Sequence, residues 1–213
     1  MSKTVFDSNL SDEITEDFFM SKAEADTVFD YFKTNPIFLW KDIHNCEDRA
    51  EAISLLLTHW NIPHYKGWVF SGFFLKKLPG SLVNWWNYHV AIVLPVKQIN
   101  TIIYYVIDPA HFNELATIAD WANLVTLEAN SYHIIKYANA YIFPTGVIKK
   151  YNWHLRNKQN LKWTMQGLAG INGVSITGKA QVTFNKHQIK RTIQRFTALK
   201  NLHPFKPYTL LSV

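Results

Sequence analysis

A capping-box pair, Ser21 and Glu24, precedes an apolar stripe at helical spacing near the start of the chain. The stripe consists of Val28, Phe29 and Phe32. We therefore expect a helix over residues 21–33. Residues 1–20 are acidic, and we expect them to form a weakly ordered lead.

A second helix is expected to begin at Cys46, because Asn45 is a good N-cap residue. Asp48 stands at the third helical position, as in a capping box. Apolar residues then recur at helical spacing at Cys46, Ala50, Ile53, Leu57 and Trp60. The segment Asn61-Ile62-Pro63 should end this helix.

The middle of the chain carries β-branched and aromatic runs that are typical of strands. The strands are expected over residues 68–75, 88–96 and 101–108 and around residues 133–143, with a possible bulge at Gly72 and a turn at Leu78-Pro79-Gly80. Near the C-terminus, residues 186–200 have the pattern of an amphipathic helix. Its inward positions are expected to be Ile189, Ile193, Phe196 and Leu199, with basic residues outward.

The second and third strands predict a specific cross-strand pair. If they form a hairpin centred between Gln98 and Ile99, His89 stands directly opposite Asp108 on one face. Their Cβ atoms would then lie about 4.5–5.5 Å apart, close enough for the imidazole to form a hydrogen bond with the carboxylate. A one-residue bulge would break this register.

Charge is distributed unevenly along the chain. Residues 1–50 contain 11 of the 16 acidic residues, whereas the segment after Glu128 has no Asp or Glu and 13 of the 22 Lys and Arg. This asymmetry predicts either an acidic partner for the C-terminal part, or that the acidic N-terminal segment packs against the basic part and compensates its positive charge. We expect three segments: residues 1–35 with the first helix, a core over 36–145, and a basic extension over 146–213 packed on the core.

Composition narrows the class of protein. Hydrophobic residues make up 48% and charged residues 18% of 213 residues, which is typical of a globular protein. A single cysteine excludes an intramolecular disulfide. The first residues contain no apolar signal-peptide core, and no apolar run is long enough to span a bilayer. We expect a cytoplasmic protein, or an effector exported without a standard signal peptide.

The lone cysteine is a candidate nucleophile, although such a residue is most often a small buried hydrophobe. At a helix start, backbone N–H groups and the helix dipole stabilise a thiolate, and the Cys46 N–H is a natural oxyanion donor. The neighbouring Glu47 and Asp48 oppose this effect. Cys46, His89 and Asp108 together supply a nucleophile, a base and a group that orients the base.

Three segments carry a resemblance to a known family. They are Cys46-x-x-Arg49-Ala50, Trp86-x-Tyr88-His89-Val90-Ala91 and Val106-Ile107-Asp108-Pro109-Ala110-x-Phe112, followed by Trp121. This pattern resembles the bacterial protein-glutaminases, which deamidate glutamine side chains in proteins, and it covers about residues 40–125.

The resemblance implies an α+β fold with a papain-like, transglutaminase-like core, N-terminal helices and an antiparallel sheet. It implies Cys46 as nucleophile, His89 as base and Asp108 as orienter, with a thioester intermediate and no metal or other cofactor. Trp86, Asn87 and Tyr88 are candidate substrate-binding residues, with simple packing as the alternative. The implied partner is a glutamine-bearing protein with an acidic surface, and we expect a monomer. Some bacterial effectors have a similar triad and deamidate a host protein.

Other functions stay open at this point. A transglutaminase-like acyltransferase would use the same triad with an amine in place of water, and a cysteine peptidase would cleave the backbone. The basic C-terminal part, with interleaved aromatic residues, could bind single-stranded nucleic acid, although no RRM, KH or helix-turn-helix signature is present. His59 and His64 lack the HExxH spacing of a zinc site.

Overall fold

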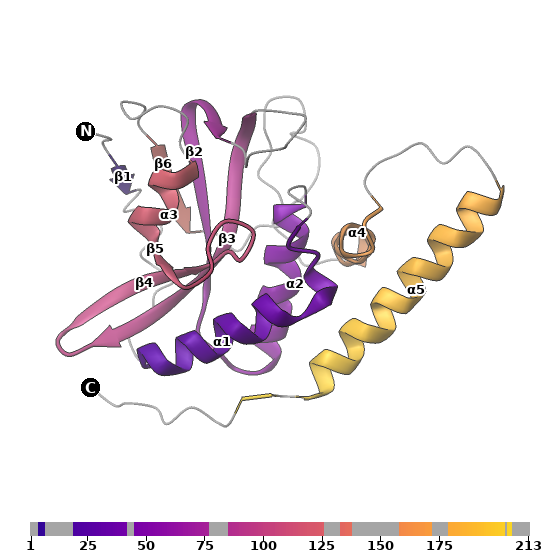
Figure 1. Cartoon of the computed structure of the whole chain (residues 1–213), viewed down its shortest axis with the longest axis horizontal. Coiled ribbons are helices and arrows are strands. Elements are labelled where there is room, and N and C mark those ends of the chain that lie inside the picture. The colour runs from indigo at the N-terminus through magenta and orange to yellow at the C-terminus, as the bar shows by residue number, and fades with distance from the viewer. Residues whose placement is uncertain are drawn as a thin grey trace.

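The structure is a computed structural model that describes residues 4–6, 19–41, 45–76, 85–125, 133–137, 158–171, 179–202 and 204–205. Five α-helices and six strands are defined in these ranges (Figure 1). The helices are α1 (Lys22–Thr34), α2 (Cys46–His59), α3 (Ile118–Val125), α4 (Lys158–Leu168) and α5 (Lys179–Leu202), with a short 3-10 helix, η2 (Pro36–Phe38). The strands are β1 (Thr4–Phe6), β2 (Tyr65–Lys76), β3 (Trp85–Gln98), β4 (Thr101–Ile107), β5 (Ala116–Thr117) and β6 (His133–Tyr137).

The strands form one sheet in the order β1-β6-β2-β3-β4-β5. The β1–β6 pair is parallel, and the other pairs among the described strands are antiparallel. In Figure 1, α1 and α2 lie on one side of this sheet and α3 on the other, with α4 and α5 beyond α2. The architecture is therefore α+β, as the family resemblance implied.

Alternation along β3 builds two hydrophobic cores, one on each face of the sheet. One face presents Val90, Ile92, Leu94 and Val96 to a large core that also includes residues of α1, α2, α4 and α5. The other face presents Ala91 and Val93 to a smaller core with Trp121 of α3. Because successive strand residues point to opposite faces, His89 shares the face of Ala91 and Val93.

The first two helices confirm the predicted boundaries. Ser21 caps α1 through the predicted capping box, in which its side chain accepts from the Glu24 N–H and the Glu24 carboxylate accepts from the Ser21 N–H. α2 begins at Cys46, but its predicted cap is wrong. Asn45 adopts a left-handed conformation (φ 65°), makes no side-chain cap bond, and its Nδ2 donates to the Gly167 carbonyl at 3.4 Å. Asparagine tolerates this conformation better than most residues.

A buried ion pair fixes α2 against the sheet. Lys66 of β2 bonds the carboxylate of Glu51 of α2, and both side chains are almost fully buried. Removal of one partner of such a pair strongly destabilises the fold, because the other charge is then left uncompensated in the interior. The orientation of α2, and with it the position of Cys46, is thereby tied to β2.

The predicted hairpin register is wrong by two residues. β3 and β4 pair Gln98 with Thr101 and Ile92 with Ile107, so the turn consists of Ile99 and Asn100. Ile99 takes a φ of 51° and is 92% exposed, which is unusual for a β-branched residue and explains why the turn was hard to predict. A shift of two residues preserves the face of every side chain, because the strand period is two.

Several further expectations differ from the structure or fall outside it. Residues 4–6, in the segment expected to be a weakly ordered lead, form β1, which pairs with β6. The strand pairing of β2 is irregular between Phe70 and Leu75, which includes the expected bulge at Gly72. Ile193 was expected to face inward, but it is 46% exposed. The predicted turn at 78–80 and the boundary near 144–146 lie outside the described residues. No helix in the described ranges is long and apolar enough to cross a membrane.

Candidate active site

Cys46 lies at the first position of α2, where backbone N–H groups are not used by the helix itself. Its thiol donates a hydrogen bond to Oε2 of Glu47 at 3.2 Å, and its sulfur accepts from the backbone N–H of Val90. Burial and the Glu47 carboxylate raise the pKa of the Cys46 thiol well above its usual value, although Arg49 and the Val90 N–H act in the opposite direction. The Cys46 side chain is therefore a neutral thiol at neutral pH.

The Val90 contact places Cys46 at an edge of β3. β3–β4 pairing ends at Ile92 and Ile107, so β4 does not continue alongside Val90 and His89. The sulfur of Cys46 thereby lies beside the residue that follows His89, although Cys46 belongs to the core on the α2 face of the sheet.

His89 and Asp108 form a buried pair. Nε2 of His89 lies 2.8 Å from Oδ2 of Asp108, and the two side chains are 2% and 5% exposed. Continuing the hairpin register would place Asp108 opposite Ala91, two residues from His89. Diagonal neighbours of this kind can still meet through long side chains. The predicted contact is therefore present, although the predicted register is not.

Asp108 is the centre of a network of nitrogen atoms. Besides His89, Nδ1 of His111 lies 2.9 Å from Oδ2, and the indole N–H of Trp121 donates to the same oxygen at 2.9 Å. Burial alone would raise the pKa of Asp108, but His111 and His89 hold the pKa well below its usual value. The carboxylate is therefore ionised, and it accepts hydrogen bonds without donating one.

The ionised carboxylate sets the protonation of His89. Because Nε2 faces an acceptor, Nε2 carries the ring proton and Nδ1 is the basic nitrogen. Burial lowers the pKa of His89, and the charge of Asp108 only partly offsets this effect. At neutral pH His89 is thus a neutral imidazole with a defined tautomer, which is the form that can accept a proton.

Cys46, His89 and Asp108 line one narrow cavity together with Arg49 and Trp40. The cavity has a volume of about 10 Å³, room for roughly one water molecule. The guanidinium of Arg49 lies over the Trp40 ring at 5.5 Å from its centroid, and it is 5% exposed. Its positive charge acts to lower the pKa of both Cys46 and His89. Three residues that are separate in sequence thus share one cavity with a buried cation.

The candidate substrate-binding residues are only partly described. The side chains of Trp86 and Asn87 lie outside the described part of the structure. The Tyr88 ring is 5.3 Å from that of Trp68, and burial raises the pKa of its hydroxyl, with further contributions from Glu47, Cys46 and Asp48. Tyr88 therefore lies near Cys46 and the acidic side chains of Glu47 and Asp48.

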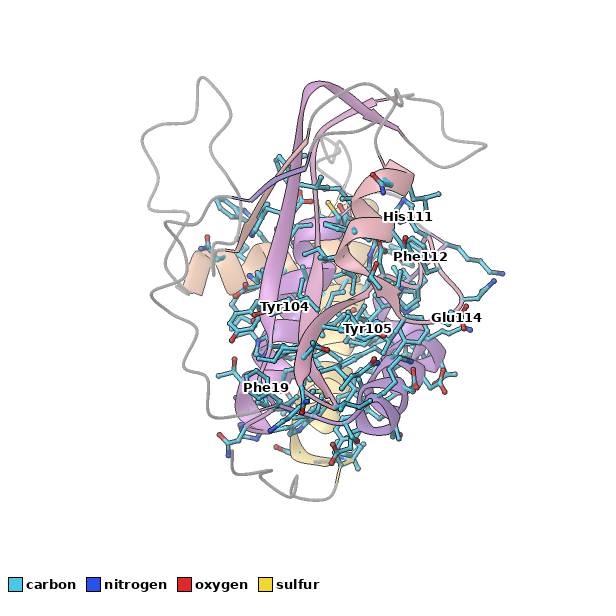
Figure 2. The ribbon with its side chains drawn as sticks, turned by 90° about the vertical axis from the view of Figure 1, so that its left-hand side faces the viewer. Phe19, Tyr104, Tyr105, His111, Phe112 and Glu114 are labelled. Carbon is cyan, nitrogen blue, oxygen red and sulfur yellow. The ribbon has the colours of Figure 1, made fainter. Side chains whose placement is uncertain are left out.

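His111 is a site residue that sequence reasoning missed. Its backbone N–H donates to the Asp108 carbonyl at 3.0 Å in the turn after β4, which brings its ring back toward the Asp108 side chain. In Figure 2, His111 and the neighbouring Phe112 lie beside α3. The three-residue spacing from Asp108 was the available signal. Trp121 is part of the resemblance, but its hydrogen bond to Asp108 depends on the tertiary position of α3.

The same cluster bears on metal binding. Within the described residues, His89, Asp108 and His111 each contribute one possible ligand atom. These three atoms lie within 4.8 Å of one another, which is close enough to coordinate one metal ion. The three side chains, however, already meet around Asp108, and the Trp121 N–H also points at Oδ2. The hydrogen-bond network accounts for their arrangement.

The chain matches a family model in sequence and solved structures in fold. Residues 16–125 match the sequence model of a family described as glutaminase. A crystal structure of protein-glutaminase has a similar fold, with a TM-score of 0.56 and 20% identity over 75% of this chain and 91% of that one. The solution structure of protein-glutaminase from Chryseobacterium proteolyticum has a TM-score of 0.54 and 18% identity, over 75% and 95% of the two chains.

A crystal structure of a pro-protein-glutaminase mutant is similar as well, with a TM-score of 0.56 and 20% identity over 80% of this chain and 67% of that one. No curated protein sequence matches the chain. The segment matched by the family model makes up more than half of the chain and contains Cys46, His89 and Asp108. This chain therefore belongs to the glutaminase family.

Proposed function

We propose that this glutaminase hydrolyses the side-chain amide of glutamine residues in proteins, with Cys46 as nucleophile, His89 as base and Asp108 as the residue that orients the base. Family membership and the fold shared with protein-glutaminases support the reaction. The observation that carries the residue roles is the 2.8 Å contact between His89 Nε2 and Asp108 Oδ2, which leaves Nδ1 as the basic nitrogen in a cavity shared with Cys46.

The first step needs proton transfer, because both partners start neutral. Nδ1 of His89 takes the thiol proton as the Cys46 sulfur attacks the carboxamide carbon. The thiol leaves its hydrogen bond with Glu47 in this step, while the Val90 N–H still faces the sulfur. The backbone N–H of Cys46 donates to the oxyanion of the tetrahedral intermediate, and Arg49 supplies nearby positive charge.

The second half of the reaction regenerates the enzyme. The protonated His89 gives its proton to the departing nitrogen, so ammonia leaves and a thioester remains on Cys46. His89 then removes a proton from water as the water attacks the thioester. The proton returns to the sulfur, and glutamate is released with one ammonia formed for each water consumed.

A mass measurement on the protein substrate tests this proposal. The wild-type chain should release ammonia from a glutamine-containing protein and raise its mass by about one unit per site, because –NH₂ is replaced by –OH. Cys46→Ala should lower kcat by at least about 10⁴-fold while keeping the thermal unfolding temperature. Residual activity in Cys46→Ala equal to that of the wild type would contradict the proposal.

Transfer to an amine is a second candidate outcome of the same thioester. The Glu47 carboxylate beside the thiol favours the approach of a cationic amine, and it is the observation that supports this alternative. Incubation of the protein substrate with a primary amine separates the two outcomes. A mass gain equal to the amine less ammonia indicates transfer, a gain of about one unit indicates hydrolysis, and a cleaved backbone indicates a peptidase.

The biological setting remains part of the proposal. A bacterial effector that acts on an acidic host protein would account for the absence of Asp and Glu after Glu128. Such an effector would reach the host cell by export from the bacterium, and its substrate would be a glutamine-bearing host protein. Identification of a host protein that gains about one mass unit per modified glutamine, only with active enzyme, would test this setting.

A further inference from the structure

A groove separate from the cavity at Cys46 lies among three helices. It has a volume of about 430 Å³ and an apolar floor. The floor consists of Leu55 from α2, Leu161 and Met165 from α4, and Ile189, Ile193 and Phe196 from α5. Leu161 and Ile193 are 45% and 46% exposed, so large apolar side chains face solvent here. Exposed apolar surface of this kind is typical of interaction sites.

The pattern on α5 explains why this surface stays open. Asn185, Thr192 and Phe196 are buried and form the side of α5 that packs on the rest of the protein. Ile189, Ile193 and Lys200 are spaced four and seven residues apart and form a neighbouring side that lines the groove. The helix therefore has an apolar side with no covering element among the described residues.

The rim of the groove is basic. Lys162 of α4 and Lys200 of α5 line it, and Lys186 and Lys190 are exposed on the turns of α5 nearby. The sequence after Glu128 contains no acidic residue to neutralise them. A ligand complementary to this groove combines apolar side chains with flanking carboxylates.

The arrangement fits a helix better than a lipid surface. Two helices with apolar residues at i and i+4 spacing form a groove that accepts the apolar stripe of a third helix. The other exposed apolar residues of α5, Phe184 and Leu202, are each nine residues from Ile193, which is half a turn away around the helix. The exposed apolar residues thus do not form one flat face that could lie on a membrane.

The groove also lies close to the nucleophile. Leu55 follows Cys46 by nine residues on α2, about 13 Å along the helix axis. α4 connects the two places directly, since Met165 lines the groove while the Gly167 carbonyl accepts from Asn45 next to Cys46. A protein bound in the groove can therefore present a neighbouring segment to Cys46.

We propose that the groove between α4 and α5 is a docking site for an acidic amphipathic helix of the protein substrate. This inference rests on the proposed function, because it assigns the groove to substrate recognition. It predicts that substrates carrying such a helix near the reactive glutamine are used more efficiently than the same glutamine in a short peptide, mainly through a lower KM.

Binding is tested first, independently of catalysis. The probe is a fluorescent synthetic peptide with leucines at i, i+3, i+4 and i+7 flanked by glutamates, and the protein is the full chain with Cys46→Ala. We expect saturable binding by anisotropy that weakens as salt is raised. A scrambled peptide of the same composition and a peptide with lysines in place of the glutamates should bind at least about tenfold more weakly.

Variants on the two sides of α5 locate the site. Ile193→Asp and, separately, Lys200→Glu should each weaken peptide binding about tenfold, the loss expected for one important contact. The control is Arg195→Glu, which makes the same charge change as Lys200→Glu. Arg195 is two residues from Ile193 and lies on the opposite side of α5, so this variant should bind the peptide as the wild type does. Lys200 is exposed, so Lys200→Glu keeps the test informative even if Ile193→Asp lowers stability.

Kinetics then connect the groove to the substrate. The ratio of kcat/KM for a helix-bearing glutamine substrate to that for the short peptide should fall in Lys200→Glu and stay unchanged in Arg195→Glu. The proposal is overturned if both Ile193→Asp and Lys200→Glu bind the peptide normally. It is also overturned if the groove residues instead control binding to anionic vesicles, or self-association measured by sedimentation. Absence of deamidation with normal peptide binding would contradict the proposed function and not the groove.

Discussion

Nε2 of His89 lies 2.8 Å from Oδ2 of Asp108, although the hairpin register offsets the two residues diagonally by two positions. The contact forms in spite of this offset because both side chains lie on one face of the sheet. Two further nitrogen atoms, from His111 and Trp121, face the same oxygen. The imidazole is therefore held by a carboxylate that is itself fixed from several sides.

Asp108→Asn should lower kcat about 100-fold and leave KM nearly unchanged, because the neutral amide fixes the His89 tautomer less well and stabilises its protonated form less. The loss should be smaller than in Cys46→Ala or His89→Ala, since Asp108 does not itself exchange a proton with the substrate. Initial-rate kinetics on a glutamine peptide measure both parameters. A variant that loses activity only through a raised KM would assign Asp108 to substrate binding instead.

The pH dependence of thiol alkylation should report the environment of Cys46. Because the thiol pKa is raised, the rate with iodoacetamide should rise with pH beyond the value of about 8.5 at which an ordinary thiol titrates. Glu47→Gln removes the negative charge and the carboxylate acceptor, so it should lower the thiol pKa and speed alkylation several-fold at pH 7.

Arg49→Gln provides the opposite control for that measurement. The substitution removes the positive charge of Arg49, which lowers the Cys46 thiol pKa, so alkylation at pH 7 should become slower. If Glu47→Gln and Arg49→Gln change the rate in the same direction, local charge does not control the thiol. Circular dichroism spectra of both variants should match the wild type, which separates charge effects from a disturbed fold.

Asp108 should also contribute to stability in a defined pH range. Its pKa is lower in the folded protein than the value of about 3.9 expected in the unfolded chain. The unfolded chain therefore binds the proton first as pH falls, and the stabilisation is present above about pH 4 and is lost below it. Urea unfolding of wild type and Asp108→Asn should show a difference in free energy that is constant from pH 7 to 5 and shrinks toward pH 3. A constant difference down to pH 3 would mean that Asp108 does not titrate in this range.

The contact between α4 and the start of α2 should be sensitive to a single methyl group. A Cβ at Gly167 would lie 1.8 Å from Oδ2 and 2.8 Å from Cβ of Asp48. Gly167→Ala should therefore destabilise the fold by about 1–3 kcal/mol and lower activity, because the helices must separate next to Cys46. Asp48→Ala removes the carboxylate, and the double variant should recover part of the loss in both measurements. Additive effects of the two substitutions would show that the contact is not limiting.

Local sequence signals were sufficient where the physics is local. The capping box at Ser21 placed the start of α1, and the apolar spacing after Cys46 identified α2, because cap bonds and side-chain periodicity act within a few residues. The start of α2 at Cys46 was also predicted correctly, but from an Asn45 cap bond that the structure lacks. The shared face of His89 and Asp108 was predicted from the hairpin register, and it is present because the register differs by two residues, which is one full strand period. The two-residue turn itself was missed because Ile99 in a left-handed conformation gives no favourable local signal.

The sequence by itself determined the helix that begins at Cys46 and the placing of His89 and Asp108 on one face of the sheet, because side-chain periodicity is encoded locally, and the family resemblance of its motifs implied the α+β class. Only the tertiary structure decided that Trp121 and His111 converge on Asp108, that Glu47 holds the thiol, and that α4 packs Gly167 against Asp48. The Trp121 and Gly167 contacts join distant segments through packing geometry, which no pattern within one segment specifies. Glu47 and His111 are close in sequence to Cys46 and Asp108, but the side-chain directions that bring them into contact depend on the surrounding packing. The apolar groove is likewise a product of how α2, α4 and α5 meet.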